Sequence, residues 1–188
     1  MHQILKNALG FSKLLISSVI KQGDTVIDAT AGNGKDTLFL AEKVGPNGRV
    51  FSFDIQQVSI DKTRQLLIAN KMEKRVILIK SGHENLESYI NMPVKAAMFN
   101  LGYLPGGDHS IITKPDTTIK AIKACLGLLE HGGLITIVIY TGHPGGNEEK
   151  KEIFDFTSTL EQTKFNVISY CFINQKNNPP QLVAIEKL

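Results

Sequence analysis

The sequence is poor in the features that mark secreted, membrane-bound or strongly charged proteins. Its two cysteines, Cys125 and Cys171, match neither a metal site nor a redox motif in their spacing, so we expect buried thiols in a reducing compartment. The apolar stretch from Leu14 to Ile20 is far shorter than the ~20 residues that cross a bilayer. We therefore expect no membrane contact and a cytoplasmic location. The formal net charge of +3, with lysines scattered along the chain, permits a polyanionic partner without requiring one.

Length and composition predict a single globular domain over residues 1–188. With 42% hydrophobic and 21% charged residues among 188, the chain can bury a sheet between helices, and no repeat, linker or low-complexity segment divides it. Apolar residues at helical spacing predict a helix over residues 3–20, which Gly23 ends. We expect the N-terminal segment, residues 1–22, to pack on the domain or to cover a ligand site.

From residue 25 onward, predicted strands and helices alternate, which indicates a parallel sheet with helices on both faces. The strands are expected at 25–30, 49–54, 75–80, 95–101, 134–140, 165–173 and 181–186, and the helices at 35–44, 57–70, 86–90, 115–130 and 148–162, the last capped by Asn147. The turn at 174–180 has no room for a helix, so the last two strands must be antiparallel. The predicted fold is α/β, with a seven-stranded, mostly parallel, Rossmann-like sheet of the class I methyltransferase type and an antiparallel strand near its edge.

The unusual loops of this chain all follow predicted strands. They are DATAGNG at 28–34, DIQ at 54–56, SGHE at 81–84, NLGYLPGGDH at 100–109 and YTGHPGG at 140–146. Parallel α/β sheets bind ligands at the carboxyl ends of their strands, close to the point where the strand order reverses. The loops are therefore expected to form one ligand site.

The first loop, DATAGNG, predicts a cofactor that carries a nucleoside. Gly32 and Gly34 let a ligand approach the backbone, and Asp28 can order the turn or bind a ligand ammonium group through water. Asp54, at the end of the next strand, is placed to accept hydrogen bonds from ribose hydroxyls. A NAD fingerprint would have a small residue at the position of Thr37, so NAD is a weaker candidate for the ligand. For the glycines alone, an ordinary tight turn is the alternative.

The third loop contains His83, which follows its strand where the adenine edge of such a cofactor would lie. Ser81 is a second candidate for contact with the ligand. A surface or capping role is the alternative for His83, and the sequence leaves both interpretations open.

The fourth loop begins with N-L-G-Y, from Asn100 to Tyr103, which resembles the Asn-Pro-Pro-Tyr motif of amino-group methyltransferases with both prolines replaced. In such a site the Asn side-chain oxygen and a backbone carbonyl accept the hydrogens of an amine and aim its lone pair at a methyl sulfonium. The aromatic ring stacks on an extruded base. The alternative is a strand end with a buried tyrosine.

Glycine-rich segments in the fourth and fifth loops carry Asp108, His109 and His143. Glycine suits a loop that closes over a substrate, and a carboxylate or an imidazole can remove a proton from an amine. Turn capping and loop structure explain the same residues, so the sequence does not choose a general base among the three.

Several segments together resemble the family described as rRNA methylases and now associated with modification of the tRNA wobble uridine. They are DATAGNGKDT at 28–37, FNLGYLPGGDHSI at 99–111, YTGHPGG at 140–146 and Asn178 to Pro180. The resemblance covers nearly the whole chain, and NLGYLPGGDH is its most specific part.

The resemblance implies an S-adenosylmethionine-dependent enzyme that methylates the 5-aminomethyl group of a tRNA wobble uridine, often 2-thiolated, and releases S-adenosylhomocysteine. The implied partner is the anticodon region of tRNA. On the residues that match, the cofactor would contact Asp28, Gly32, Asn33, Gly34, Asp36, Thr37, Asp54, Gln56, Ser81, His83 and Asn100, and catalysis would involve Asn100, Tyr103, Asp108, His109 and His143. No metal is implied.

Two other functions stay open from the sequence. The small size and the lack of a separate RNA-binding domain allow a methyltransferase of a small molecule, or of rRNA. A non-catalytic module that binds nucleotides or RNA could keep the same fold. A homodimer that supplies the anticodon-binding surface also stays open.

Overall fold

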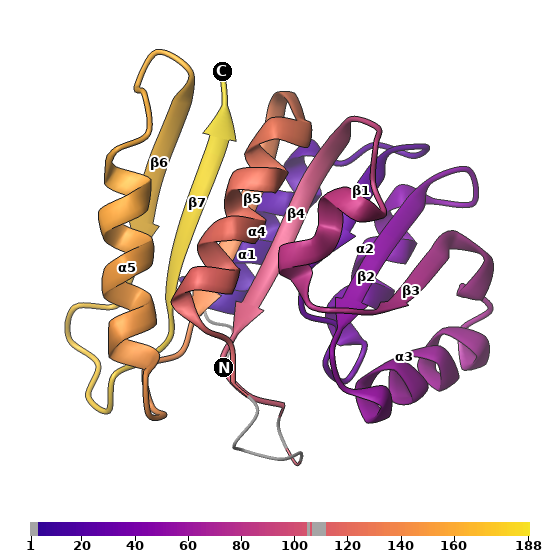
Figure 1. Ribbon diagram of the computed structural model, residues 1–188, viewed down its shortest axis with the longest axis horizontal. Coiled ribbons are helices and arrows are strands. Elements are labelled where there is room, and N and C mark those ends of the chain that lie inside the picture. Colours follow the sequence, from indigo (N-terminus) through magenta and orange to yellow (C-terminus); the bar gives the residue numbers. More distant parts are fainter. Residues whose placement is uncertain (1–3, 105, 107–111) are drawn as a thin grey trace.

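The computed structural model describes residues 4–104, 106 and 112–188. In chain order (Figure 1) its elements are α1 Ala8–Val19, β1 Thr25–Asp28, α2 Lys35–Val44, β2 Arg49–Asp54, α3 Gln57–Ala69, β3 Val76–Lys80, β4 Val94–Leu101, α4 Pro115–Leu128, β5 Leu129–Ile139, α5 Gly146–Ser158, β6 Phe165–Tyr170 and β7 Gln181–Lys187, with short 3-10 helices at Glu73–Arg75 and His83–Ser88. Within these described ranges no helix combines the length and the apolar character needed to cross a membrane.

All seven strands form one sheet in the order β3-β2-β1-β4-β5-β7-β6. The pairs from β3 to β5 are parallel, whereas β7 runs antiparallel to both β5 and β6. Figure 1 shows this reversal, since the arrows of β4 and β7 point to opposite ends of the molecule. The predicted fold class is confirmed. The strand order reverses between β1 and β4, so this is the switch point where ligand sites form.

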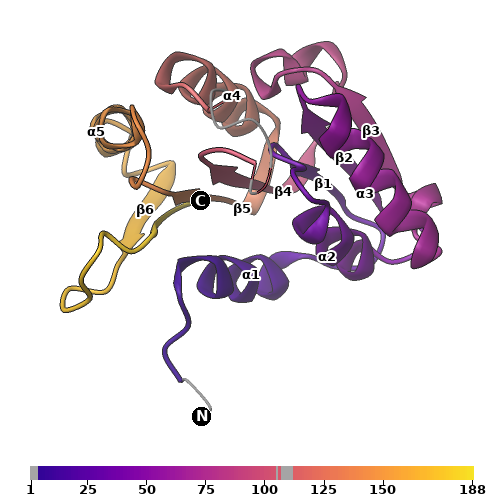
Figure 2. The ribbon, with the colours of Figure 1, turned by 90° about the horizontal axis from the view of Figure 1, so that it is seen from below.

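Side chains along the central strands alternate between two hydrophobic cores, as the two-residue period of a strand requires. In β1, Val26 belongs to the core under α1 and α2, whereas Ile27 belongs to the core under α4 and α5. In β4, Met98 and Phe99 divide in the same way. Figure 2 shows the result, with α1 and α2 on one face of the sheet and α4 and α5 on the other.

The N-terminal helix α1 packs on the sheet and begins later than residue 3. Asn7 caps it, because the Asn7 Oδ1 atom accepts a hydrogen bond of 2.8 Å from the backbone N of Gly10. The helix is fastened to β5 by a buried hydrogen bond of 2.9 Å between Ser12 Oγ and Thr136 Oγ1. Residues 4–7 lie outside the helix because the cap fixes its first turn after them.

Three details of the predicted C-terminal half are wrong. Helix α5 begins at Gly146 with Gly145 as its N-cap in a left-handed conformation (φ 82°), so Asn147 lies inside the helix and is no cap. Helix α5 also ends at Ser158 instead of residue 162. Strand β6 ends at Tyr170, which leaves Cys171 exposed in the following turn, whereas Cys125 is buried as predicted.

Strand β5 starts directly after α4, five residues before the predicted strand at 134–140. Its pairing with β4 is irregular at first, because Val94 pairs with Leu129 and the next paired residues are Ala96 and Leu134. The regular part of the strand therefore begins where the apolar run predicts it.

Gly34 allows α3 to pack closely against the start of α2. Its φ of +79° is left-handed, and a Cβ atom added there would lie 2.9 Å from Thr63 Cα and Oγ1. We expect Gly34→Ala to lower the free energy of unfolding by about 2–4 kcal/mol, because backbone strain and the clash add together. Urea denaturation followed by circular dichroism measures this loss.

Gly23→Ala is the matched control. Gly23 also has a positive φ (+97°), but no heavy atom lies within 4 Å of its added Cβ. This variant should lose only the backbone part, about 1 kcal/mol. Equal losses for the two variants would show that the contact with Thr63 has no energetic role.

Candidate active site

The turn after β1 is held from inside by the carboxyl group of Asp28. This side chain is only 1% exposed. It accepts hydrogen bonds from the backbone N of Thr30 (3.1 Å) and from Thr37 Oγ1 (2.5 Å), and Thr37 Oγ1 also lies 2.9 Å from Ser52 Oγ. Burial, with the nearby charge of Asp36, raises the pKa of Asp28 to about 7. Asp28 thus orders the turn.

Asp54 connects the end of β2 to the same turn. Its Oδ2 atom accepts a hydrogen bond of 2.9 Å from the backbone N of Gly32, and its Oδ1 atom accepts one of 2.8 Å from the backbone N of Gln56. A carboxylate offers about four acceptor positions, so these two bonds leave capacity for a ligand. Asp54 and Gln56 both line the cavity described below.

His83 is a buried residue, which excludes the surface role left open by the sequence. The His83 Nδ1 atom lies 3.1 Å from the carbonyl oxygen of Ala29. A carbonyl only accepts, so Nδ1 carries the hydrogen, and burial lowers the pKa of His83 and keeps the ring neutral. The Nε2 atom is then an acceptor, and it has no hydrogen-bond partner among the described residues.

Asn100 is oriented by two residues of neighbouring elements. Its backbone N donates to Thr30 Oγ1 (2.8 Å), and its Nδ2 donates to Asp36 Oδ2 (3.2 Å). The other oxygen of Asp36 forms an ion pair of 2.7 Å with Lys13 of α1. Because a carboxylate can only accept from the amide nitrogen, the Asn100 oxygen must point away from Asp36. This Oδ1 atom is buried and has no hydrogen-bond partner within the described ranges.

The loop after β4 is closed at its base by contacts with α4 and α5. Gly102 and Thr113 exchange two hydrogen bonds of 3.0 Å, one between backbone atoms and one from the Gly102 N to Thr113 Oγ1. The buried Glu149 of α5 accepts hydrogen bonds of 2.7 Å from Thr113 Oγ1 and Thr118 Oγ1. These contacts fix where the loop leaves and rejoins the body of the domain.

Tyr103 follows Gly102 and is 39% exposed, so the buried position considered for it is wrong. Its ring meets that of His143 edge to face, with 6.0 Å between ring centroids. Asp108 and His109, the other two predicted catalytic residues of this loop, lie outside the described residues.

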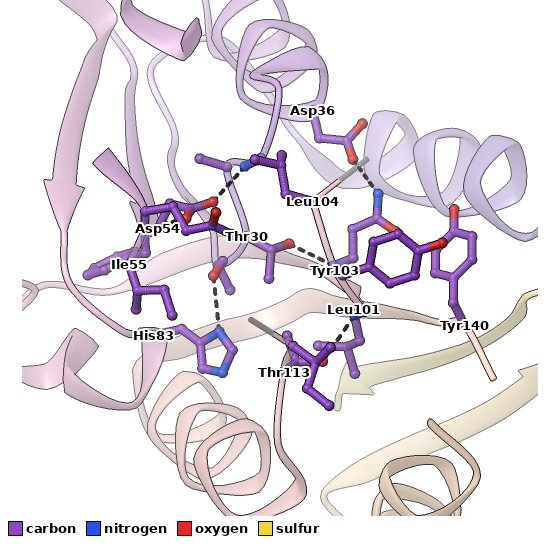
Figure 3. A pocket seen from close by; sticks show the side chains of 18 of the residues that line it. Thr30, Asp36, Asp54, Ile55, His83, Leu101, Tyr103, Leu104, Thr113 and Tyr140 are labelled. Carbon is purple, nitrogen blue, oxygen red and sulfur yellow. Dashed lines mark hydrogen bonds between the residues drawn. The ribbon is translucent and has the colours of Figure 1, made fainter. Parts of the chain in front are cut away.

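Several of these side chains line a cavity of about 980 Å³ at the carboxyl ends of the strands (Figure 3). It is at the large end of the range for small-ligand sites. Figure 3 shows Asp54 and His83 toward one end, and Tyr103, Tyr140 and Asp36 toward the other. The predicted site residues that line it are Gly32, Asn33, Asp36, Asp54, Gln56, Ser81, His83, Asn100, Tyr103 and His143.

Three predicted cofactor residues, Asp28, Gly34 and Thr37, are buried and do not line the cavity. They stabilise the loop whose other residues line the cavity. Conversely, the cavity wall includes Lys13, Thr30 and residues of the fifth loop's start that the sequence did not nominate, among them Tyr140. The sequence gives no sign that a lysine on a helix will line a ligand cavity, because the position of Lys13 depends on how α1 packs. Among the described residues no group of His, Cys, Asp and Glu could hold a metal ion.

The sheet order, the antiparallel β7 and a cavity at the switch point together define the class I methyltransferase architecture. The family described as "Putative rRNA methylase" matches residues 50–186. A chloroplastic tRNA (mnm(5)s(2)U34)-methyltransferase of Arabidopsis thaliana is 40% identical over 184 residues, which cover 93% of this chain and 67% of the plant protein. The chain belongs to this rRNA methylase family.

Two solved structures support the same assignment. A "putative rRNA-methylase" of Clostridium thermocellum is 54% identical, has a TM-score of 0.97, and the match covers 99% of this chain and 100% of that one. A "putative methyltransferase" of Streptococcus mutans, in complex with SAH, is 41% identical with a TM-score of 0.91, covering 98% and 100%. Both confirm the predicted fold along nearly the whole chain.

The buried Asp28 carboxyl predicts a pH-dependent stability. Because its pKa in the folded protein is raised from an ordinary value of 3.8 to about 7, the folded state keeps a proton that the unfolded state loses between these values. The free energy of unfolding should therefore fall as the pH rises through this window, by at most about 1.4 kcal/mol per pH unit, and level off above pH 7.

Asp28→Asn should remove this slope, because the amide does not ionise. It can still accept from Thr30 N and can donate to Thr37 Oγ1, which then donates to Ser52 Oγ. Urea denaturation at pH 5.0, 6.5 and 8.0 compares the variants, with the exposed Asp61→Asn reporting the effect of removing one surface charge. If the difference in the free energy of unfolding between wild type and Asp28→Asn does not change with pH, the Asp28 carboxyl is not protonated in the folded state.

Proposed function

We propose that this chain is an S-adenosylmethionine-dependent methyltransferase that transfers a methyl group to the 5-aminomethyl group of the wobble uridine in tRNA. The single observation that carries the proposal is the Asn100 amide. Its oxygen is buried at the cavity wall without a partner among the described residues, and Asp36 fixes the direction in which it points. An acceptor held in this way suits a substrate that brings N–H donors, as an amine does.

The cavity residues fit an S-adenosyl ligand. The unpaired Nε2 of His83 can accept a hydrogen bond from the exocyclic amine of adenine, and the free acceptor positions of Asp54 suit ribose hydroxyls. Both residues lie toward the same end of the cavity (Figure 3). When bound, this cofactor supplies an electrophilic methyl group. The Streptococcus mutans relative, in complex with SAH, supports this assignment.

The substrate would enter from the end of the cavity that Asn100 and Tyr103 line. The exposed Tyr103 ring offers a face for stacking on an extruded base, which is worth about 1–3 kcal/mol per base in other proteins. The name of the plant relative, a tRNA (mnm(5)s(2)U34)-methyltransferase, supports the anticodon region of tRNA as the partner. A cytoplasmic location is part of this proposal, although the plant relative is named as chloroplastic.

Methyl transfer to tRNA from cells that lack this protein tests the substrate. Such tRNA carries the acceptor amine, and nucleoside mass spectrometry should find the 5-methylaminomethyl product after incubation with the enzyme and S-adenosylmethionine. Unmodified transcript, which lacks the amine, is the negative control. Activity should fall steeply with salt, because phosphate contacts release counterions. Methylation of rRNA or of a free metabolite, with none of this tRNA, would overturn the proposal.

Asn100→Ala tests the role of the amide. We expect kcat to fall by about 100-fold or more, because the amine loses the acceptor that orients it, whereas the Kd for S-adenosylmethionine should change by less than about threefold. Isothermal titration calorimetry and single-turnover assays separate the two effects. Asn91→Ala, an exposed residue outside the cavity, is the matched control. Unchanged turnover in Asn100→Ala would refute the assigned role.

A further inference from the structure

His143 lies on the loop between β5 and α5, and one of its ring nitrogens is fixed by the backbone. The Nδ1 atom lies 2.9 Å from the carbonyl oxygen of Pro144. Because that oxygen can only accept, Nδ1 carries the hydrogen. In the tautomer that this contact selects, the lone pair lies on Nε2, which is then the ring atom that can take up a proton.

This Nε2 atom is buried and has no hydrogen-bond partner among the described residues. It faces Gly102, since a Cβ atom added to that glycine would lie 3.6 Å from it. A buried acceptor without a partner is costly to the folded state, so such a group calls for a function. Asn100 Oδ1, two residues before Gly102, is a second buried acceptor of this kind. Both residues line the cavity.

Among the described residues, the titratable groups around His143 are otherwise engaged. Asp36 is paired with Lys13 and with the Asn100 amide, and Glu149 of α5 accepts from two threonines. Burial and the charge of Asp36 raise the pKa of Tyr140, so its phenol stays protonated. Tyr103 packs edge to face on the imidazole. His83 lies with Asp54 toward the other end of the cavity, away from Tyr103 (Figure 3).

We propose that His143 is the general base of this methyl transfer, with Nε2 taking a proton from the substrate ammonium group. The proposal rests on the function proposed above. An alkylamine is protonated near neutral pH, like lysine with a pKa of about 10.4, and has no lone pair to react until a proton leaves. Desolvation in the cavity makes this loss easier.

The step balances as follows. One N–H bond of the ammonium breaks and its proton moves to His143 Nε2, which leaves a neutral amine whose remaining hydrogens can bond to Asn100 Oδ1. The nitrogen lone pair forms the new N–C bond to the donated methyl group, while the carbon–sulfur bond breaks and its electron pair stays on sulfur. The products are a secondary ammonium group and a neutral thioether, and His143 releases its proton to water.

Two conservative variants separate the two ring nitrogens. In His143→Asn the amide nitrogen can occupy the place of Nδ1 and keep the bond to Pro144, but nothing replaces Nε2. In His143→Gln the side chain reaches the place of Nε2 with a group that does not titrate. His131→Gln is the matched control, because His131 is exposed on β5 and does not line the cavity.

The assay measures single-turnover methyl transfer to the amine-bearing tRNA between pH 6.5 and 9.0, with the Kd for S-adenosylmethionine measured in parallel. At pH 7 we expect both His143 variants to react at least 100-fold more slowly than wild type, with cofactor affinity within threefold. The deficit should shrink about tenfold per pH unit as solvent deprotonates the amine. His131→Gln should match wild type.

Each other outcome overturns the proposal. If the rate deficit stays constant with pH, His143 only supports the loop through Nδ1. The same conclusion follows if His143→Asn reacts at a near-normal rate while His143→Gln reacts slowly. The same pH-dependent deficit in His109→Gln, with His143→Gln active, would assign the base to His109. Wild-type protein that binds cofactor and transfers no methyl group to this tRNA would overturn the proposed function, and the role of His143 with it.

Discussion

The turn from Ala29 to Gly34 keeps its shape because the Asp28 carboxyl beneath it accepts hydrogen bonds from both of its sides. Three functional groups at the switch point are attached to this turn. The Ala29 carbonyl sets the tautomer of His83. The Thr30 hydroxyl accepts a hydrogen bond from the backbone N of Asn100, and the backbone N of Gly32 donates one to Asp54. A single rigid turn thus fixes three strand ends relative to one another, which a site for two ligands requires.

The same arrangement explains why polar groups are buried here without a partner in the protein. A buried acceptor is costly, and most proteins satisfy nearly all of them. Within the described ranges, His83, Asn100 and His143 each carry a buried acceptor without a hydrogen-bond partner, and all three residues line one cavity. A side-chain nitrogen of each residue is held by the protein, through Ala29, Asp36 and Pro144 respectively. These three residues thereby combine one nitrogen fixed by the protein with one acceptor that a ligand can use, whereas the buried Ser59 Oγ atom, also without a partner in the described ranges, does not line the cavity.

The sheet, and the edge of it where the ligand site lies, can be predicted from the sequence because they depend on local patterns. Apolar runs ending in Asp28, Asp54 and Asn100 predict strands whose carboxyl ends meet, and the short turn before residue 181 predicts the antiparallel pair. The ion pair between Lys13 and Asp36 does not follow from any local pattern, because it depends on where α1 lies on the sheet relative to α2 (Figure 2). The cap of α5 is missed for another reason, since Gly145 caps through its left-handed backbone and offers no side chain to recognise.

The position of β7 between β5 and β6 has a consequence for how the chain assembles during synthesis. Among the described strands, β6 pairs with β7 alone, and β7 separates it from β5. A nascent chain that has emerged only as far as β6 therefore has no strand for it to join, and the edge of β5 stays open as a template for other chains. The five parallel strands can form first, but completion of the sheet must wait for a segment translated later. Chaperone dependence of a shortened chain would arise at this edge and not at the ligand site.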